Sequence, residues 1–173
     1  GKTLAFNFGS DYNGHKIKVI ATISASVVGA KTKTATESQT TTVDTEALAT
    51  ATTVSIGKAD VYKVSTIHMA ADFSTAATTS DTEITDRFNT DDGQRDNFYD
   101  ISRLVRIPGK PAPTGRLLIT FDYYEHGAGN FFSVDSYSGI DYADISAYTS
   151  DVTGEQFALR DCLDFRPRVD DAS

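Results

Sequence analysis

The densest group of side chains that could bind a ligand lies between residues 86 and 96, where four aspartates surround a glycine turn. Calcium prefers six to eight hard oxygen ligands, so such a group raises the possibility of a calcium site. The spacing does not fit the twelve-residue calcium loop, because no acid stands at the position of its bidentate glutamate. Two arginines in the same stretch would also repel a cation. The weak calcium candidates are Asp86, Asn89, Asp91 and Asp92.

A structural turn is the favoured interpretation of this group. Aspartate and asparagine side chains accept hydrogen bonds from nearby backbone N–H groups and so stabilise turns. Arg87 and Arg95 can form ion pairs with the neighbouring carboxylates. We therefore expect no cofactor and no metal here.

Residues for nucleophilic or hydrolytic chemistry are present but are not arranged in a recognisable motif. Cys162 is the only cysteine, which excludes an intrachain disulfide, and the three histidines are scattered at positions 15, 68 and 126. Cys162 adjoins Leu163 and is expected to be a small buried hydrophobe. A glycosidase needs two carboxylates at a set separation, and the many acids between residues 122 and 144 favour no pair. The chain is expected not to be an enzyme.

Aromatic residues are concentrated between residues 121 and 148. Aromatic side chains fill β-sheet cores and also anchor protein interfaces. Core positions are expected for Phe121, Phe131 and Val134. Tyr137 and Tyr142, near a Ser-Gly turn, are candidates for interface contacts. In the segment 159–168, acids alternate with arginines and are expected to pair with them.

A threonine-rich segment dominates the first third of the chain, since ten of the 23 residues from Lys31 to Thr53 are threonine. Threonine favours extended backbone, but the stretch from Lys31 to Thr36 has no apolar face. A strand of this kind has a weakly specified register unless another chain covers it. A solvated ribbon or loop is the favoured expectation, and an ordered arm leaning on a neighbour is the alternative. Thr32, Thr34 and Thr36 are interface candidates in the second case.

Elsewhere the apolar residues alternate with a period of two, which indicates strands. On this basis strands are expected at Ile17–Ile23 and Arg116–Tyr124, and a further strand is expected at Val61–Ile67 from its β-branched residues. Another is expected at Phe131–Tyr137, joined to the preceding strand by a glycine-containing hairpin. The stretch 93–107 is ambiguous between a helix and a strand. The fold class is therefore mainly β: a sandwich-like antiparallel module with a Thr-rich extended arm and little helix.

Two parts of the chain differ in composition. Residues 1–56 are expected to form an N-terminal β segment with the Thr-rich arm, and residues 57–173 an aromatic-rich β domain. The net charge of −8 argues against nucleic acid as a partner. No apolar run approaches the length of about 18 residues that a membrane helix needs, so no membrane insertion is expected.

Four ordered blocks in the second part resemble those of large virion structural proteins of tailed phages, notably of marine myovirus type. They are residues 86–100, 121–127, 132–137 and 159–167, and residues 57–64 resemble the lead-in to them. Such proteins are long, β-rich tail-fibre or baseplate components, so the resemblance implies assembly in a virion or an extracellular fibre. The start at Gly1-Lys2-Thr3 agrees with a piece of a longer polypeptide.

The leading hypothesis is therefore a non-enzymatic structural module of a phage tail, fibre or similar assembly. Its partners would be other copies of itself or other structural subunits. The alternative is a receptor- or glycan-binding module at a fibre tip, with a host surface glycan as partner. A polysaccharide depolymerase is the third and weakest hypothesis.

Overall fold

A computed structural model describes residues 5–10, 14–16, 18, 20, 22, 28–46 and 52–169 of the chain. Its backbone is mainly β, and in these residues the helical segments are single turns of three or four residues. The elements in chain order are β1 Lys33–Val43, β2 Thr53–Ala59, β3 Val61–Met69, β4 Thr82–Glu83, η3 Thr85–Arg87, β5 Phe88–Asp91, β6 Ile101–Arg106, β7 Leu117–His126, η4 Val134–Ser136, η5 Tyr142–Asp144, β8 Ala147–Thr149, β9 Gln156–Ala158 and η6 Leu159–Cys162.

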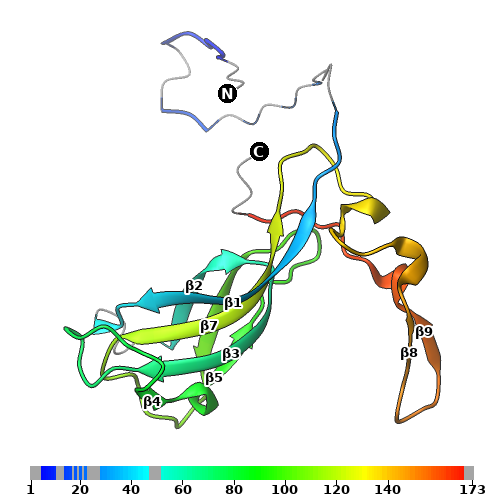
Figure 1. Cartoon of the computed structure of the whole chain (residues 1–173). Helices are drawn as coiled ribbons and strands as arrows, with labels where there is room; N and C mark the ends of the chain where they lie inside the picture. Colours follow the sequence, from blue (N-terminus) through cyan, green and yellow to red (C-terminus); the bar gives the residue numbers. More distant parts are fainter. Residues whose placement is uncertain are drawn as a thin grey trace.

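Two antiparallel sheets form the body of the molecule (Figure 1). One has the strand order β1-β7-β3-β4 and the other the order β2-β6-β5. A separate ribbon, β8–β9, extends away from both sheets. The predicted fold class, a mainly β, sandwich-like antiparallel module with little helix, is confirmed.

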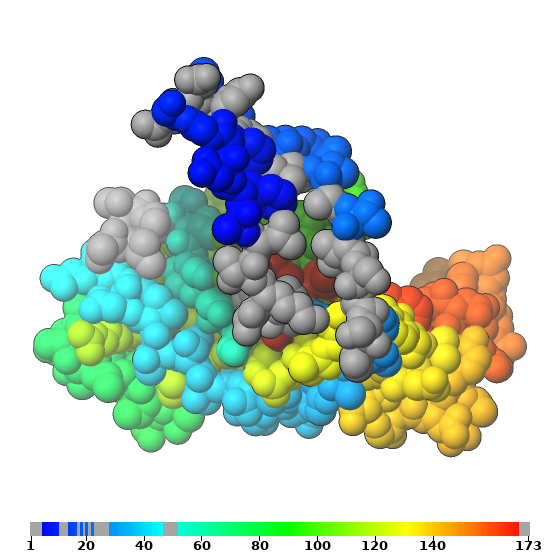
Figure 2. Space-filling model, turned by 90° about the horizontal axis from the view of Figure 1, so that it is seen from above, coloured from blue at the N-terminus to red at the C-terminus, as the bar shows by residue number. Residues whose placement is uncertain are grey.

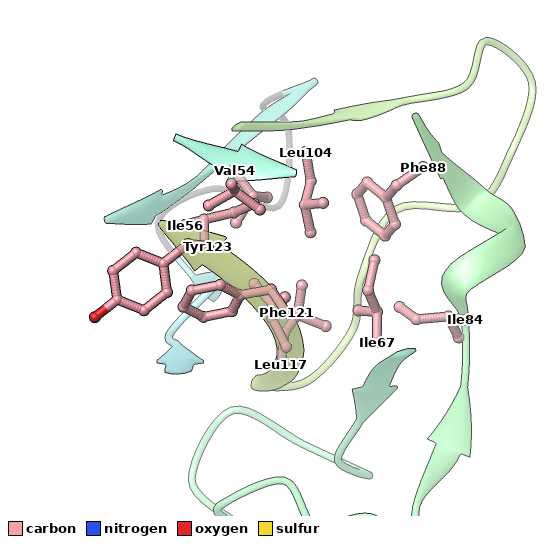
Figure 3. Packing of buried hydrophobic residues seen from close by; sticks show 11 residues of the cluster. Val54, Ile56, Ile67, Ile84, Phe88, Leu104, Leu117, Phe121 and Tyr123 are labelled. Carbon is pink, nitrogen blue, oxygen red and sulfur yellow. The ribbon is translucent and has the colours of Figure 1, made fainter. Parts of the chain in front are cut away.

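The core lies between the two sheets (Figure 3). Along β7, every second side chain from Leu117 to Tyr123 is buried, as strand alternation requires. The facing sheet contributes Val54, Leu104 and Phe88 to the same cluster. Burial of each such side chain stabilises the fold by about 1.5–3 kcal/mol relative to full exposure.

The strands predicted at Val61–Ile67 and Arg116–Tyr124 are confirmed as β3 and β7. The ambiguous stretch 93–107 ends in strand β6. The prediction at Ile17–Ile23 falls mostly outside the described residues.

The predicted strand and hairpin at Phe131–Tyr137 are wrong. Phe131 makes one parallel bridge with Ala30, and the chain then turns through η4. The Ser136 hydroxyl accepts a hydrogen bond from the Ser133 N–H at 2.8 Å and closes that turn. Phe131 and Val134 are exposed rather than in the core, whereas Phe121 is buried as expected.

The Thr-rich segment is an edge strand rather than a solvated loop. β1 pairs with β7 of the same chain along its length, with a shift of register between Thr36 and Gln39. At its C-terminal side, the Thr45 hydroxyl is fully buried and donates to the Gly115 carbonyl at 2.9 Å. The predicted boundary between residues 56 and 57 falls inside β2. Each of the two sheets combines a strand that begins before this boundary, β1 or β2, with strands that follow it.

Candidate functional site

Three strand ends bring a lysine, an aspartate and a histidine together. Lys33 is the first residue of β1 and His126 the last of β7, and antiparallel pairing places these two residues directly opposite each other. Asp60 is the single residue between β2 and β3, at the corner where the chain passes from one sheet to the other. We call Lys33, Asp60 and His126 the buried triad.

The three side chains meet at one carboxylate oxygen. Asp60 Oδ2 lies 3.0 Å from Lys33 Nζ and 2.8 Å from His126 Nε2. The side chains are almost fully buried, with exposed fractions of 2% for Lys33, 4% for Asp60 and 0% for His126. Asp60 has a positive φ of 57°, a left-handed conformation that aspartate tolerates better than most residues. Its own carbonyl accepts a hydrogen bond from the Tyr124 N–H at 3.0 Å, which fixes the corner.

Three tyrosine rings enclose the lysine ammonium. Lys33 Nζ lies 5.2 Å from the ring centroid of Tyr99, 5.0 Å from that of Tyr124 and 5.4 Å from that of Tyr137. Cation–π contacts of this length are attractive, and more so when the cation is withdrawn from water. We call Tyr99, Tyr124 and Tyr137 the tyrosine cage.

The C-terminal segment 164–169 closes the cage from outside. The Tyr99 hydroxyl donates to the Asp164 carboxylate, and the Tyr137 hydroxyl donates to the Asp164 carbonyl at 2.8 Å. Arg166 forms an ion pair with Asp164 and stacks its guanidinium 4.8 Å from the Tyr99 ring centroid. Of the acid–arginine pairing expected in the segment 159–168, the Asp164–Arg166 pair is present, whereas Arg160 lies over the Tyr142 ring and Arg168 donates to the Tyr124 carbonyl. Cys162, however, is exposed rather than buried, because it lies in the turn η6 at the surface.

The cage shifts the pKa values of its members in the direction that burial dictates. Burial raises the pKa of Tyr99, Tyr124 and Tyr137, and at Tyr99 the hydrogen bond to the Asp164 carboxylate raises it further. Burial also raises the pKa of Asp164, but hydrogen bonds from Arg166 and Tyr99 outweigh it and hold that pKa well below its usual range.

A cavity of about 340 Å³ adjoins the buried triad and the cage. Its wall includes Lys33, Asp60 and the three cage tyrosines, and Asp164. The Lys33 ammonium and the Asp60 carboxylate contact each other, and they do not both point toward one place where a ligand could bind. This arrangement suits chemistry between Lys33 and Asp60, or a fixed ion pair, better than recognition of a charged ligand.

The four calcium candidates are spread over separate contacts. Asp86 pairs with Lys110 at 2.6 Å, and Asn89 is exposed on β5. Asp91 accepts two hydrogen bonds from the Arg95 guanidinium and one from the Gly93 N–H, and Asp92 accepts from the Gln94 N–H. Within the described part of the chain, no three His, Cys, Asp or Glu side chains form a metal-binding group. These contacts are those of the expected structural turn.

The interface candidates have different environments. Thr32, just before β1, and Thr34, within it, are exposed, and Thr36 of β1 is half-buried. Tyr142 is half-buried, and the Arg160 guanidinium carbon lies 5.9 Å from the centroid of the Tyr142 ring. Tyr137 differs from the expectation of an exposed contact, because it is buried in the tyrosine cage.

The β8–β9 ribbon is an exposed apolar surface that the sequence interpretation missed. Tyr148 and Phe157 are paired directly across it and are 51% and 48% exposed. Val152, at its tip, is 94% exposed. The ribbon forms one edge of the molecule (Figure 2, orange).

Comparisons with protein-family models, with curated proteins and with solved structures gave no match. In the described ranges, no helix is long and apolar enough to cross a membrane.

Proposed function

We propose that the chain is a non-enzymatic structural module of a phage tail, fibre or similar extracellular assembly. It acts through contacts between subunits, either copies of this chain or other structural proteins of the particle. The resemblance of four sequence blocks to tailed-phage virion proteins motivates the biological setting. The exposed β8–β9 ribbon is the observation that carries the assembly role.

The ribbon supports a contact role because of its composition and its position. A two-stranded hairpin is marginally stable on its own in water, so it gains from packing against a partner. Tyr148 and Phe157 lie directly opposite each other and therefore on the same face, where they form one aromatic pair. Tyrosine and other aromatic residues are enriched at the centres of protein interfaces.

The outer edge of β1 is a second surface that favours assembly. β1 has β7 on one side. On the other side its first residue, Lys33, bridges Tyr137, and no described strand of the chain pairs with the rest of that edge. Edge strands offer unpaired N–H and C=O groups to another chain. At the beginning of β1 this side is occupied, because the Lys33 carbonyl accepts a hydrogen bond from the Ser138 N–H at 2.9 Å. A neighbouring subunit would therefore add along the part of β1 that follows, from exposed Thr34 onward.

Light scattering across a dilution series tests the proposal. The wild-type chain is expected to form an oligomer whose mass falls on dilution. The double variant Tyr148→Ser, Phe157→Ser is expected to remain a monomer at the same concentrations, because it loses the aromatic pair. Val105→Thr is the matched control, since Val105 is 37% exposed on β6 and outside the ribbon. A wild-type monomer at every concentration, or a double variant that associates like wild type, would contradict the role of the ribbon.

Glycan binding is the second candidate, because exposed aromatic rings such as Tyr148 also stack on sugars. A glycan array with the wild-type chain and the Tyr148→Ser, Phe157→Ser variant distinguishes the two. Binding that is lost in the variant, in a chain that is monomeric throughout, would favour the receptor-binding alternative over assembly.

A further inference from the structure

We propose that Lys33 and Asp60 condense into an intramolecular amide, joining Lys33 Nζ to the side-chain carbonyl carbon of Asp60. His126 is the acid–base residue of this reaction. The product is a covalent cross-link between the beginning of β1 and the corner that joins β2 to β3.

The geometry of the buried triad holds the reactants together. Lys33 Nζ lies 3.0 Å from Asp60 Oδ2, so the nitrogen is beside the carboxyl group that it would attack. Reacting groups held at about 3–3.5 Å in a folded chain can reach effective molarities of about 10⁵–10⁸ M. The Asp164 carbonyl oxygen, 3.4 Å from Nζ, and the tyrosine cage further restrict the ammonium.

Burial favours the amide over the ion pair. Removing two charges from water is costly, and their attraction offsets this cost only partly. Condensation converts the ammonium and the carboxylate into a neutral amide, which removes both charges from the interior. With side-chain exposures of 2% and 4%, the product is also shielded from hydrolysis.

The reaction balances with the groups present. One proton passes from the Lys33 ammonium to Asp60 Oδ2, and the nitrogen lone pair then forms a bond with the carboxyl carbon. His126 Nε2, 2.8 Å from Oδ2, donates a second proton to that oxygen and recovers one from the nitrogen. The bond from carbon to Oδ2 breaks, water leaves, and Oδ1 remains as the amide carbonyl oxygen. The adjoining cavity of about 340 Å³ has room for the released water.

The chain contains its own comparison pair. Lys63 Nζ lies 3.5 Å from Asp122 Oδ2, but Lys63 is 61% exposed. The Asp122 carboxylate is only 9% exposed, but the exposed Lys63 ammonium keeps its hydration, which opposes the loss of its charge. We expect the Lys63–Asp122 pair to remain ionic.

Intact mass spectrometry of the purified full chain tests the cross-link. We expect a mass lower than that of the sequence by one water molecule. Peptide mapping should find the Lys33 and Asp60 peptides joined, and trypsin should not cleave after Lys33. Lys63→Arg, the matched control, should retain the loss of water. A chain that is synthesised and kept in denaturant, so that it never folds, should have the full sequence mass, because the reaction needs the fold.

Asp60→Asn gives a sharper test, because asparagine tolerates the left-handed backbone at this corner. Its side-chain amide should react with Lys33 and release ammonia, so that the cross-linked variant and the cross-linked wild type have the same mass. Lys33→Arg and Asp60→Ala should both keep their full sequence mass.

His126→Gln keeps a hydrogen-bond donor but cannot exchange protons near neutral pH. Cross-link formation after refolding should be slowed about 10²-fold or more. Circular dichroism checks that each variant is folded. Folded wild type that keeps its full mass after prolonged incubation and is cleaved after Lys33 would overturn the proposal, as would a folded Asp60→Asn variant that releases no ammonia.

Discussion

The tyrosine cage shows how single residues couple the strands to the C-terminal segment. Tyr99 and Tyr137 both contact Lys33 through their rings and Asp164 through their hydroxyls. A change at one of these positions therefore affects the ion pair and the segment 164–169 together. Their shifted pKa values make this coupling measurable.

The fold is expected to lose stability at high pH. The pKa values of Tyr99, Tyr124 and Tyr137 are raised in the folded state, so the fold favours their neutral forms. Their contribution is complete below the usual tyrosine pKa of about 10 and is lost as the pH rises above it, because tyrosines of the unfolded chain ionise first. The free energy of unfolding, measured with urea from about pH 8 to about pH 11, spans the usual tyrosine pKa and tests this expectation. In Tyr99→Phe the free energy of unfolding should fall less steeply with pH than in the wild type. An equally steep fall would contradict a raised pKa for Tyr99.

The Asp164–Arg166 contact is expected to matter at low pH. The pKa of Asp164 is lowered in the folded state, so its contribution is complete above the usual aspartate value of about 3.9 and is lost as the pH falls through the folded-state pKa. Asp164→Asn should cost about 1–3 kcal/mol at neutral pH and reduce the acid-dependent part of unfolding. Denaturation midpoints of both chains at pH values from about 7 to 2 provide the test. If the midpoints of the two chains fell in parallel with pH, ionisation of Asp164 would not contribute to stability.

At the scale of the elements, the turn after β5 depends on one glycine. Gly93 has a φ of +79°, and a Cβ there would lie 2.1 Å from the Asp100 carbonyl oxygen. Gly93→Ala should therefore destabilise the fold by more than the roughly 1 kcal/mol typical of a glycine conformational change. Gly57→Ala is a matched control, since Gly57 also has a positive φ but a Cβ there would meet no atom within 4 Å. If thermal unfolding showed the same loss of stability for both variants, backbone strain rather than the clash with Asp100 would account for the effect.

The sequence was sufficient to predict β7 because its alternation of apolar residues follows from burial on one face. It was sufficient for β3 because β-branched residues favour strands, although burial along β3 does not alternate. It was not sufficient for β1, whose threonines have no apolar pattern and whose strand state depends on pairing with β7. Phe131–Tyr137 was mistaken for a strand because local hydrogen bonding between Ser133 and Ser136 outweighs its aromatic β propensity.

The buried triad could not be predicted, since Lys33, Asp60 and His126 are far apart in sequence and only the topology brings them together. The turn at Asp91–Arg95 could be predicted, because its contacts are local.

For the whole molecule, the sandwich and the exposed ribbon have separate roles in the proposed assembly. The two sheets enclose the core and the buried triad, whereas β8–β9 leaves its aromatic pair outside. The chain also carries a net charge of −8, so copies repel each other at long range. Added salt, which screens this repulsion, should raise the oligomer mass in light scattering if apolar contacts hold the subunits. A lower mass in salt would instead indicate that ion pairs hold them.

Hydrogen–deuterium exchange of the wild-type chain at two protein concentrations tests the central claim most directly. The backbone amides of Ala147–Thr149 and Gln156–Ala158 belong to a short, exposed hairpin, and such hydrogen bonds open easily in an isolated molecule. We predict slow exchange of these amides at high concentration and fast exchange at low concentration, with β3 and β7 equally protected in both. Fast exchange of the ribbon at both concentrations would contradict its role as a subunit contact.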